Sequence, residues 1–195
     1  MILKKLLNSQ ALSLIKNFKN ENKEVFDVAI YGSAVKGKTN FNDLDIAILL
    51  NNKVPTSKKL SLSQELKNNL KKQIKYELDV KSIDLYDFMD QNFIARQGII
   101  ASGYLILNQK NISDLFGFKP YSIFKYALNG LNNSQKTIFR YAMGGRRKEK
   151  GLLNLKGGEQ LGKGSVRIPS IYEEEFKEFF DKFNINYKII RSLCW

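Results

Sequence analysis

Two aspartates, Asp43 and Asp45, stand two residues apart at the start of an almost continuously apolar segment, residues 44–50. Side chains two residues apart on an extended segment point to the same face, so these two carboxylates would lie together. Like charges at that distance repel each other, and a divalent cation between them removes this cost. Because carboxylate oxygen is the ligand that Mg²⁺ prefers, the pair predicts a metal site.

Gly32 and Ser33 follow another apolar segment, residues 24–31. A tight turn after a strand presents backbone N–H groups and a hydroxyl, which can bind the terminal phosphates of a nucleotide. Glycine lets the phosphate approach the backbone closely. Alone, Gly-Ser is usually an ordinary turn, and Asp-x-Asp is usually a solvated loop or a helix cap. Here the two pairs occur together, with Gly-Ser directly after one predicted strand and Asp-x-Asp at the start of the next. This combination favours a functional site over two unrelated turns.

The elements that must position these residues follow from the spacing of apolar side chains. Helices are predicted over residues 4–20, 57–75, 85–101, 134–143 (capped by Asn133 or Ser134) and 172–183. Strands are predicted over residues 24–31, 44–50, 76–83, 104–107, 120–128, 166–168 and 187–193, with a glycine-rich basic loop over 144–164. The pattern predicts an α/β (α+β) domain over residues 1–110, with a mixed sheet flanked by helices. A small basic α+β module is predicted over residues 111–195.

The motif residues resemble a known family. Gly32-Ser33, Gly37 and Asp43-Leu44-Asp45-Ile46-Ala47-Ile48 are similar to the glycine-serine and DxD signature of the DNA polymerase β superfamily nucleotidyltransferases, and most similar to the minimal nucleotidyltransferases. The resemblance covers about residues 24–108. Lys36 stands where those enzymes usually have Arg, and Asn42 where they have Ser. A lysine can still meet a phosphate, but without the bidentate fork of arginine.

The resemblance also implies a third carboxylate on a later strand, and Asp79 is the residue that matches it. Glu77 shares the face of Asp79 but lies where the strand begins, and Asp84 has the position of a helix cap. A shift of one residue in register would turn a carboxylate to the other face of the sheet. Asp79 is therefore the favoured residue.

The family's mechanism, carried onto these positions, is a metal-dependent nucleotidyl transfer. Asp43, Asp45 and Asp79 would bind two Mg²⁺ ions, or Mn²⁺ in their place, and Asp79 would also act as general base. Gly32, Ser33 and Lys36 would bind the nucleoside triphosphate, with ATP expected. An acceptor hydroxyl would attack the α-phosphorus and release pyrophosphate.

Composition narrows the possible chemistry. The chain has no histidine, which excludes imidazole bases and Ser-His-Asp triads. Its one cysteine, Cys194, excludes an internal disulfide and a cysteine-based zinc cage. No apolar run is long enough for a signal peptide or a membrane span, so we expect a cytoplasmic protein.

Positive charge is concentrated in the second half of the chain. The formal net charge is +13, which suggests a polyanionic partner. Six basic residues are candidates for nucleic-acid binding: Arg140, Arg146, Arg147, Lys148, Lys150 and Lys163. Phe139, Tyr141 and Tyr126 could stack on bases. The alternative is that these aromatic residues belong to the core and the basic residues form a solvated face.

Three functions are compatible with the sequence. The first is transfer of a nucleoside monophosphate onto RNA or another nucleic acid, which the basic module favours. The second is adenylylation of a protein, as in the antitoxins among the minimal nucleotidyltransferases, although these usually lack a basic extension of this length. The third is non-catalytic nucleic-acid binding on the same fold. The presence of all three acids counts against the third.

Overall fold

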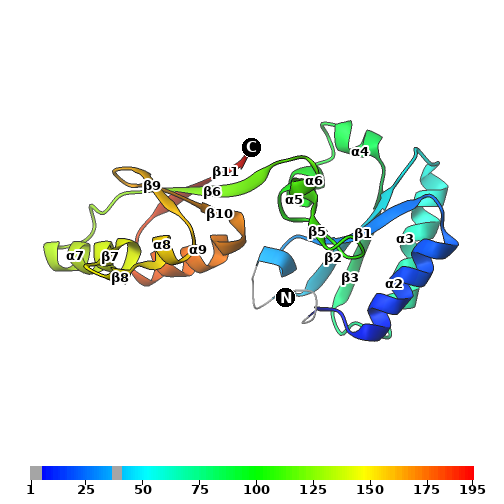
Figure 1. Ribbon diagram of the computed structural model, residues 1–195, viewed down its shortest axis with the longest axis horizontal. Coiled ribbons are helices and arrows are strands. Elements are labelled where there is room, and N and C mark those ends of the chain that lie inside the picture. Colours follow the sequence, from blue (N-terminus) through cyan, green and yellow to red (C-terminus); the bar gives the residue numbers. More distant parts are fainter. Residues whose placement is uncertain (1–5, 37–40) are drawn as a thin grey trace. The chain divides into compact units, whose positions relative to one another are not determined.

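The computed structural model describes residues 6–36 and 41–195. The chain divides into two compact units, Met1–Phe116 and Gly117–Trp195 (Figure 1). Within the described ranges, no helix is both long and apolar enough to cross a membrane.

The first unit is built on a five-stranded mixed sheet with the order β3-β2-β1-β4-β5. Its strands are β1 (Val25–Tyr31), β2 (Asp43–Leu50), β3 (Glu77–Ile83), β4 (Tyr104–Leu105) and β5 (Lys110–Asn111). β2 and β3 pair in parallel, and the other neighbours are antiparallel. The mixed sheet and its flanking helices confirm the predicted fold class.

Helices cover the two faces of this sheet differently (Figure 1). They are α2 (Ser9–Glu21), α3 (Thr56–Leu70), α4 (Leu85–Met89), α5 (Ala95–Ser102) and α6 (Ile112–Leu115), with the 3-10 turn η1 (Ala34–Lys36). Apolar residues of α2 and α3 form the larger core with one face of β1 and β2. Ile99 of α5 and Ile112 of α6 pack on the other face, against Ala29, Ala47 and Ile83.

Two predicted helices differ from the structure. In the prediction for residues 4–20, residues 4 and 5 lie outside the described part of the chain, and Leu7 and Asn8 are not helical. α2 begins at Ser9, because the side chain of Asn8 accepts a hydrogen bond from Ala11 N at 2.8 Å and caps the helix there. The helix predicted over residues 85–101 is split into α4 and α5. An extended backbone at Asp90 ends α4, and the Asp90 carboxylate accepts from Asn92 N at 2.9 Å.

The second unit contains a four-stranded antiparallel sheet with the order β11-β6-β10-β9. Its elements are β6 (Lys119–Tyr126), α7 (Asn133–Gly144), β7 (Gly145–Arg146), β8 (Glu149–Lys150), α8 (Leu152–Leu155), β9 (Glu159–Gly162), β10 (Ser165–Pro169), η2 (Ser170–Tyr172), α9 (Glu173–Lys182) and β11 (Tyr187–Cys194). Without the β7–β8 hairpin and α8, this is a β-α-β-β-α-β unit of the ferredoxin-like type.

An aromatic core holds the helices of the second unit against one face of its sheet. Phe124 of β6 stacks on Phe180 of α9 with 5.2 Å between ring centroids, and Phe139 of α7 lies 5.9 Å from Phe180.

The predicted cap of α7 was wrong by one or two residues. This helix is capped by Asn132, not by Asn133 or Ser134, because Asn132 and Gln135 form a reciprocal capping box.

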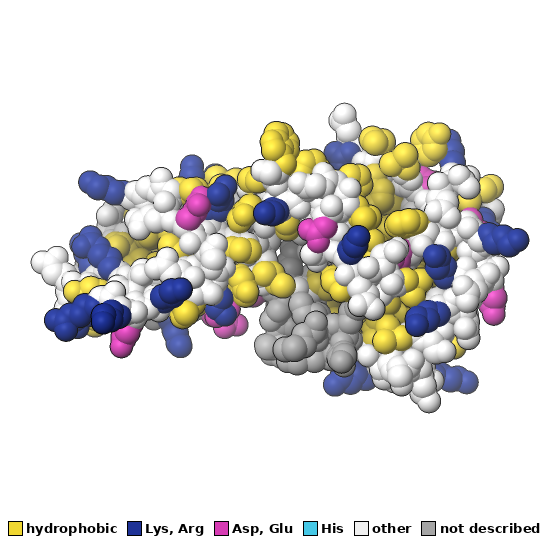
Figure 2. Space-filling model, viewed as in Figure 1, with side chains coloured by type: hydrophobic (Ala, Val, Ile, Leu, Met, Phe, Trp, Pro, Cys, Tyr) yellow, Lys and Arg dark blue, Asp and Glu magenta, His cyan; other side chains and the backbone are white. Residues whose placement is uncertain are grey.

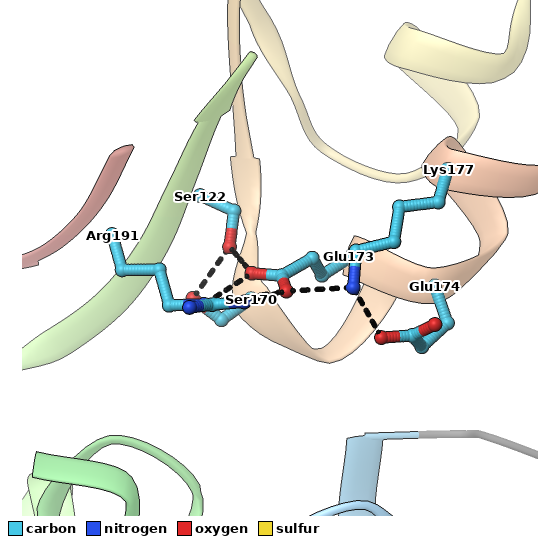
Figure 3. A network of polar contacts seen from close by, with 6 residues as sticks. All are labelled: Ser122, Ser170, Glu173, Glu174, Lys177 and Arg191. Atoms are coloured by element: carbon cyan, nitrogen blue, oxygen red, sulfur yellow. Dashed lines mark hydrogen bonds and ion pairs between the residues drawn. The ribbon is translucent and has the colours of Figure 1, made fainter. Parts of the chain in front are cut away.

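A buried carboxylate ties α9 to this sheet. Glu173 is 1% exposed and accepts hydrogen bonds from Arg191 Nη2 at 2.6 Å and from Ser122 Oγ at 2.6 Å (Figure 3). Burial alone would raise the pKa of Glu173, but the hydrogen bonds from Arg191 and Ser122 and the charge of Lys177 lower that pKa to about 2. This network joins β6, α9 and β11.

Candidate active site

The three predicted site aspartates lie near the starts of two neighbouring parallel strands, β2 and β3. In the register of β2 and β3, Asp45 stands beside Asp79 and Asp43 beside Glu77. Residues that are directly adjacent in a sheet point to the same face, so Asp43, Asp45 and Asp79 share one face. Asp43 is exposed, and the other two are partly buried.

Gly32 lies directly against this carboxylate group. It follows Tyr31, which pairs with Asp45 across β1 and β2, and its φ of +77° is one that side-chain-bearing residues rarely adopt. A Cβ atom added at Gly32 would overlap Oδ2 of Asp45. The backbone N–H of Gly32 also points at Ser102 Oγ, 3.4 Å away. The turn and the carboxylate therefore fit together only with glycine at this position.

Negative charge accumulates around Asp45. Its pKa is raised by burial and then by the carboxylates of Asp43 and Asp79. The Tyr31 hydroxyl beside it is buried. Burial raises the pKa of Tyr31 to about 12. A cation placed here would relieve the repulsion between the carboxylates.

Lys81 places a positive charge next to these carboxylates. Its Nζ atom lies 2.8 Å from Oδ2 of Asp79, and its charge also lowers the pKa of Asp45. The hydrogen bond to Asp79 raises the pKa of Lys81. The sequence interpretation missed this residue, although its position two residues after Asp79 puts both side chains on one face of β3.

The donor set fits a divalent cation by its chemistry, since three carboxylates share one face and the glycine turn leaves space beside Asp45. Within residues 6–36 and 41–195, no three acidic or thiol side chains are already gathered as a metal cage. Asp79 is held by Lys81 instead. Metal binding through Asp79 would therefore require the Lys81 ammonium to move away from that carboxylate.

A cavity of about 360 Å³ opens beside Lys81. Its lining consists of Lys81, Ser82, Ile83, Asp87, Asp90, Asn92 and Phe93. The wall formed by α4 is fixed by Lys59, which lies 2.7 Å from Asp84 Oδ2, and by the capping box between Asp84 and Asp87. Asp84 is thus a helix cap, as the sequence predicts. Lys81, the ion-pair partner of Asp79, is the member of this lining that lies closest to the predicted site in the sequence.

The remaining predicted nucleotide-binding residues lie around η1. Ser33 is partly buried between Gly32 and this turn. Lys36 ends η1, but its side chain lies outside the described part of the chain, as does all of Gly37.

The predicted nucleic-acid-binding residues lie on the surface of the second unit. Arg140 on α7, Arg146, Arg147, Lys148 and Lys150 on the β7–β8 hairpin, and Lys163 between β9 and β10 are all exposed. Figure 2 shows dark blue side chains around the end of this unit that carries α7 and the hairpin.

The aromatic candidates near these basic residues divide into two groups. Tyr141 is 44% exposed and carries the Arg146 guanidinium 5.0 Å from its ring centroid. Phe139 is buried, and Tyr126 packs against it at 5.5 Å between centroids. Phe139 and Tyr126 are therefore core residues, and Tyr141 is the one with an accessible ring.

The sequence of the first unit matches the model of a known protein family. The sequence model described as Polymerase beta, Nucleotidyltransferase matches residues 13–112. A search of curated proteins found no match. Among solved structures, a toxin-antitoxin MntA-HepT crystal structure is similar at 15% identity and a TM-score of 0.38, over 56% of this chain and 80% of that chain.

Two further solved structures have similar values. A toxin-antitoxin structure with AMP-PNP matches at 19% identity and a TM-score of 0.39, over 54% of this chain and 79% of that one. A chain from a tri-AMPylated Shewanella oneidensis HEPN toxin in complex with MNT antitoxin matches at 18% identity and a TM-score of 0.37, over 54% and 76%.

Proposed function

Because the chain belongs to the polymerase beta nucleotidyltransferase family, whose model matches just over half of it, we propose that it transfers a nucleoside monophosphate from a nucleoside triphosphate to an acceptor hydroxyl. ATP is the proposed donor, and two Mg²⁺ ions are the proposed cofactors. The observation that carries this proposal is the register of β2 and β3, which aligns Asp45 with Asp79 next to the Gly32 turn.

Each site residue has a separate role in this reaction. Asp43, Asp45 and Asp79 would hold the ions, which supply charge stabilisation for the triphosphate and a lowered pKa for the acceptor hydroxyl. Asp79 accepts the proton of that hydroxyl. The hydroxyl oxygen forms a bond to the α-phosphorus while the bond from this phosphorus to the bridging oxygen of the β-phosphate breaks, and pyrophosphate leaves.

The backbone at Gly32 and Ser33 binds the phosphates of the donor. The positive φ of Gly32 turns the chain sharply after β1, next to the carboxylate of Asp45. Backbone N–H groups and a hydroxyl in such a turn suit phosphate oxygens. Lys36, at the end of η1, is the proposed cationic contact to the same phosphates.

Nucleic acid, and RNA in particular, is the proposed acceptor. Residues 117–195 contain 15 Lys and Arg against 7 Asp and Glu, which is +8 of the net charge of +13. Arg140, the basic residues of the β7–β8 hairpin and Lys163 would contact phosphates.

A protein is the second candidate acceptor, because apolar side chains are exposed around α4. Leu85, Tyr86, Met89 and Ile94 are 58%, 61%, 71% and 85% exposed. An exposed apolar patch of this kind favours a protein contact. It flanks the cavity beside Lys81, since Asp87 of the same helix lines that cavity.

The test is incubation of the full chain with Mg²⁺ and ATP labelled at the α-phosphate, first with RNA and then with protein from the native host. The proposal expects label on RNA. The Asp43→Asn/Asp45→Asn variant should reduce the label by more than about 100-fold, because even replacing a residue that only orients a metal ligand costs about 10- to 100-fold. If only protein became labelled, the acceptor would be a protein and not RNA. No transfer to either would contradict the enzymatic proposal.

A further inference from the structure

The sheet of the second unit has helices on one face only. α7, α8 and α9 lie on the same side of β6, β9, β10 and β11 (Figure 1). Their core contacts the side chains of Phe124, Val166 and Ile168. The alternate residues of these strands point to the opposite face, which we call the open face.

Residues of similar chemistry lie in rows across the strands of the open face, as the strand register shows. One row contains Lys188, Lys125 and Ser165, and the next contains Ile190, Ile123, Arg167 and Glu159. A third row contains Ser192, Tyr121 and Pro169. A cationic row, an apolar and guanidinium row, and an aromatic row therefore follow one another.

The cationic row is unusual in a sheet. Lys125 and Lys188 stand directly opposite each other on β6 and β11, both are exposed, and like charges in this arrangement destabilise a sheet. Neither lysine forms an ion pair with an acid in residues 6–36 and 41–195, and neither does Lys119 at the other end of β6. A bound polyanion would supply the missing negative charge.

Glu159 does not change this balance, because Arg167 neutralises it. Arg167 Nη2 lies 2.6 Å from Glu159 Oε1. The uncompensated charge of the face is then wholly positive. A second copy of the chain docked through this face would bring lysines against lysines, so the charges favour an anionic ligand instead.

Flat groups for base stacking lie next to the cationic row. The guanidinium of Arg167 on β10 lies 4.6 Å from the ring centroid of Tyr121 on β6, and both strands are central in the sheet. Nucleic-acid bases stack on tyrosine rings and on guanidinium planes. Ile123 and Ile190 extend the flat surface, and Ile190 is 38% exposed. Ser165 and Ser192 add hydroxyls that can pair with a ribose 2′-OH.

We infer that the open face binds single-stranded RNA, with bases over Tyr121 and Arg167 and phosphates on Lys125 and Lys188. This goes beyond the proposed transferase activity, because binding needs neither the aspartates nor a nucleotide. Unpaired bases are required, since a duplex hides the faces that would stack on Tyr121.

The test measures fluorescence anisotropy of a labelled 12-nucleotide single-stranded RNA with the full chain, without nucleotide or metal. Tyr121→Ala should weaken binding about 5- to 150-fold, because one stacked base contributes about 1–3 kcal/mol. Tyr121→Phe should bind like the wild type. Lys125→Gln/Lys188→Gln should reduce the slope of log affinity against log salt by about 1.4, for two lost phosphate contacts.

Matched controls separate this face from other basic surfaces. Lys148→Gln/Lys150→Gln removes the same charge from the β7–β8 hairpin, and the inference expects a smaller loss than for Lys125→Gln/Lys188→Gln. Because Lys125 and Lys188 are exposed, their replacement tests the inference even if Tyr121→Ala fails to fold, which circular dichroism would reveal.

Four results would overturn the inference. They are wild-type affinity in both open-face variants, a greater loss in the hairpin variant, equal affinity for duplex RNA, or equal affinity for single-stranded DNA of the same sequence. The Asp43→Asn/Asp45→Asn variant should keep wild-type RNA affinity. A failure of catalysis would therefore leave RNA binding measurable, and a failure of RNA binding would leave nucleotidyl transfer to be tested separately.

Discussion

The two units are both sheets with helices against them, yet they concentrate opposite charges. In the first unit, Asp43, Asp45 and Asp79 lie together near the starts of β2 and β3, and Lys81 partly balances their charge. In the second, Lys125 and Lys188 stand opposite each other with no acid paired to either in the described chain. Each arrangement costs stability until a ligand of opposite charge binds. Nucleotidyl transfer and binding of a polyanion are therefore proposed for separate units.

Replacing Asp45 by Asn tests the first half of this comparison most strongly. We expect transferase activity to fall on the order of 10³-fold, within the range for losing a positioned catalytic group. The thermal stability should rise at neutral pH. Burial and the neighbouring carboxylates raise the pKa of Asp45 above its unfolded value, so its ionisation on raising the pH opposes folding.

The measurements are initial rates and Tm as a function of pH. The gain in Tm should disappear at acid pH, where Asp45 is protonated in both states. Glu178→Gln, an exposed acid on α9, is the control and should change neither quantity. A loss of stability in Asp45→Asn at neutral pH would contradict the view that the carboxylates repel each other.

Glu173→Gln is expected to have the next largest effect, and on the second unit. The pKa of Glu173 is depressed from 4.5 to about 2, which corresponds to about 3 kcal/mol of stability at neutral pH. That contribution is present above the unfolded pKa and is lost as the pH falls from about 4.5 toward 2.

Hydrogen exchange of the full chain would locate the effect of Glu173→Gln. Amides of residues 117–195 should lose protection, and those of β1 and β2 should lose less. The control is Glu174→Gln, since the side chain of Glu174 is 26% exposed against 2% for Glu173. Its pair with Lys177 should therefore be closer to the about 0–1 kcal/mol that surface pairs contribute. Equal effects of the two substitutions would show that the buried network in Figure 3 is not what holds α9.

Sequence patterns predicted the parts of the fold that short-range chemistry determines. The apolar run over residues 44–50 locates β2, and the carboxyl group of Asp84 caps α4 as expected. The breaks were harder to predict. The apolar stripe over residues 85–101 continues through Asp90, where the backbone leaves the helix, and Ile94 in that stripe is 85% exposed.

Contacts between residues far apart in the chain could not be predicted from local sequence patterns. Nothing local indicates that Glu173, in a run of three glutamates, is buried against Arg191 eighteen residues later. The open face also depends on strand order, because Lys125 and Lys188 become neighbours only when β11 pairs with β6. Lys81 could have been found, since the two-residue spacing from Asp79 predicts a shared face.

Lys81→Met gives the smallest expected effect. It tests how far the ammonium group of Lys81 balances the negative charge of the site carboxylates. Removing the ammonium frees Asp79 from an ion pair at 2.8 Å, and exposed pairs of this kind contribute up to about 1 kcal/mol. The affinity for Mn²⁺, measured by electron paramagnetic resonance, should therefore increase about fivefold. Lys81→Arg keeps the charge and should keep the wild-type affinity, and Lys188→Met in the second unit should have no effect. Weaker Mn²⁺ binding in Lys81→Met would mean that Lys81 supports the metal site and does not compete for it. The acidic unit would then not compensate its own charge, and it would no longer differ from the basic unit in this respect.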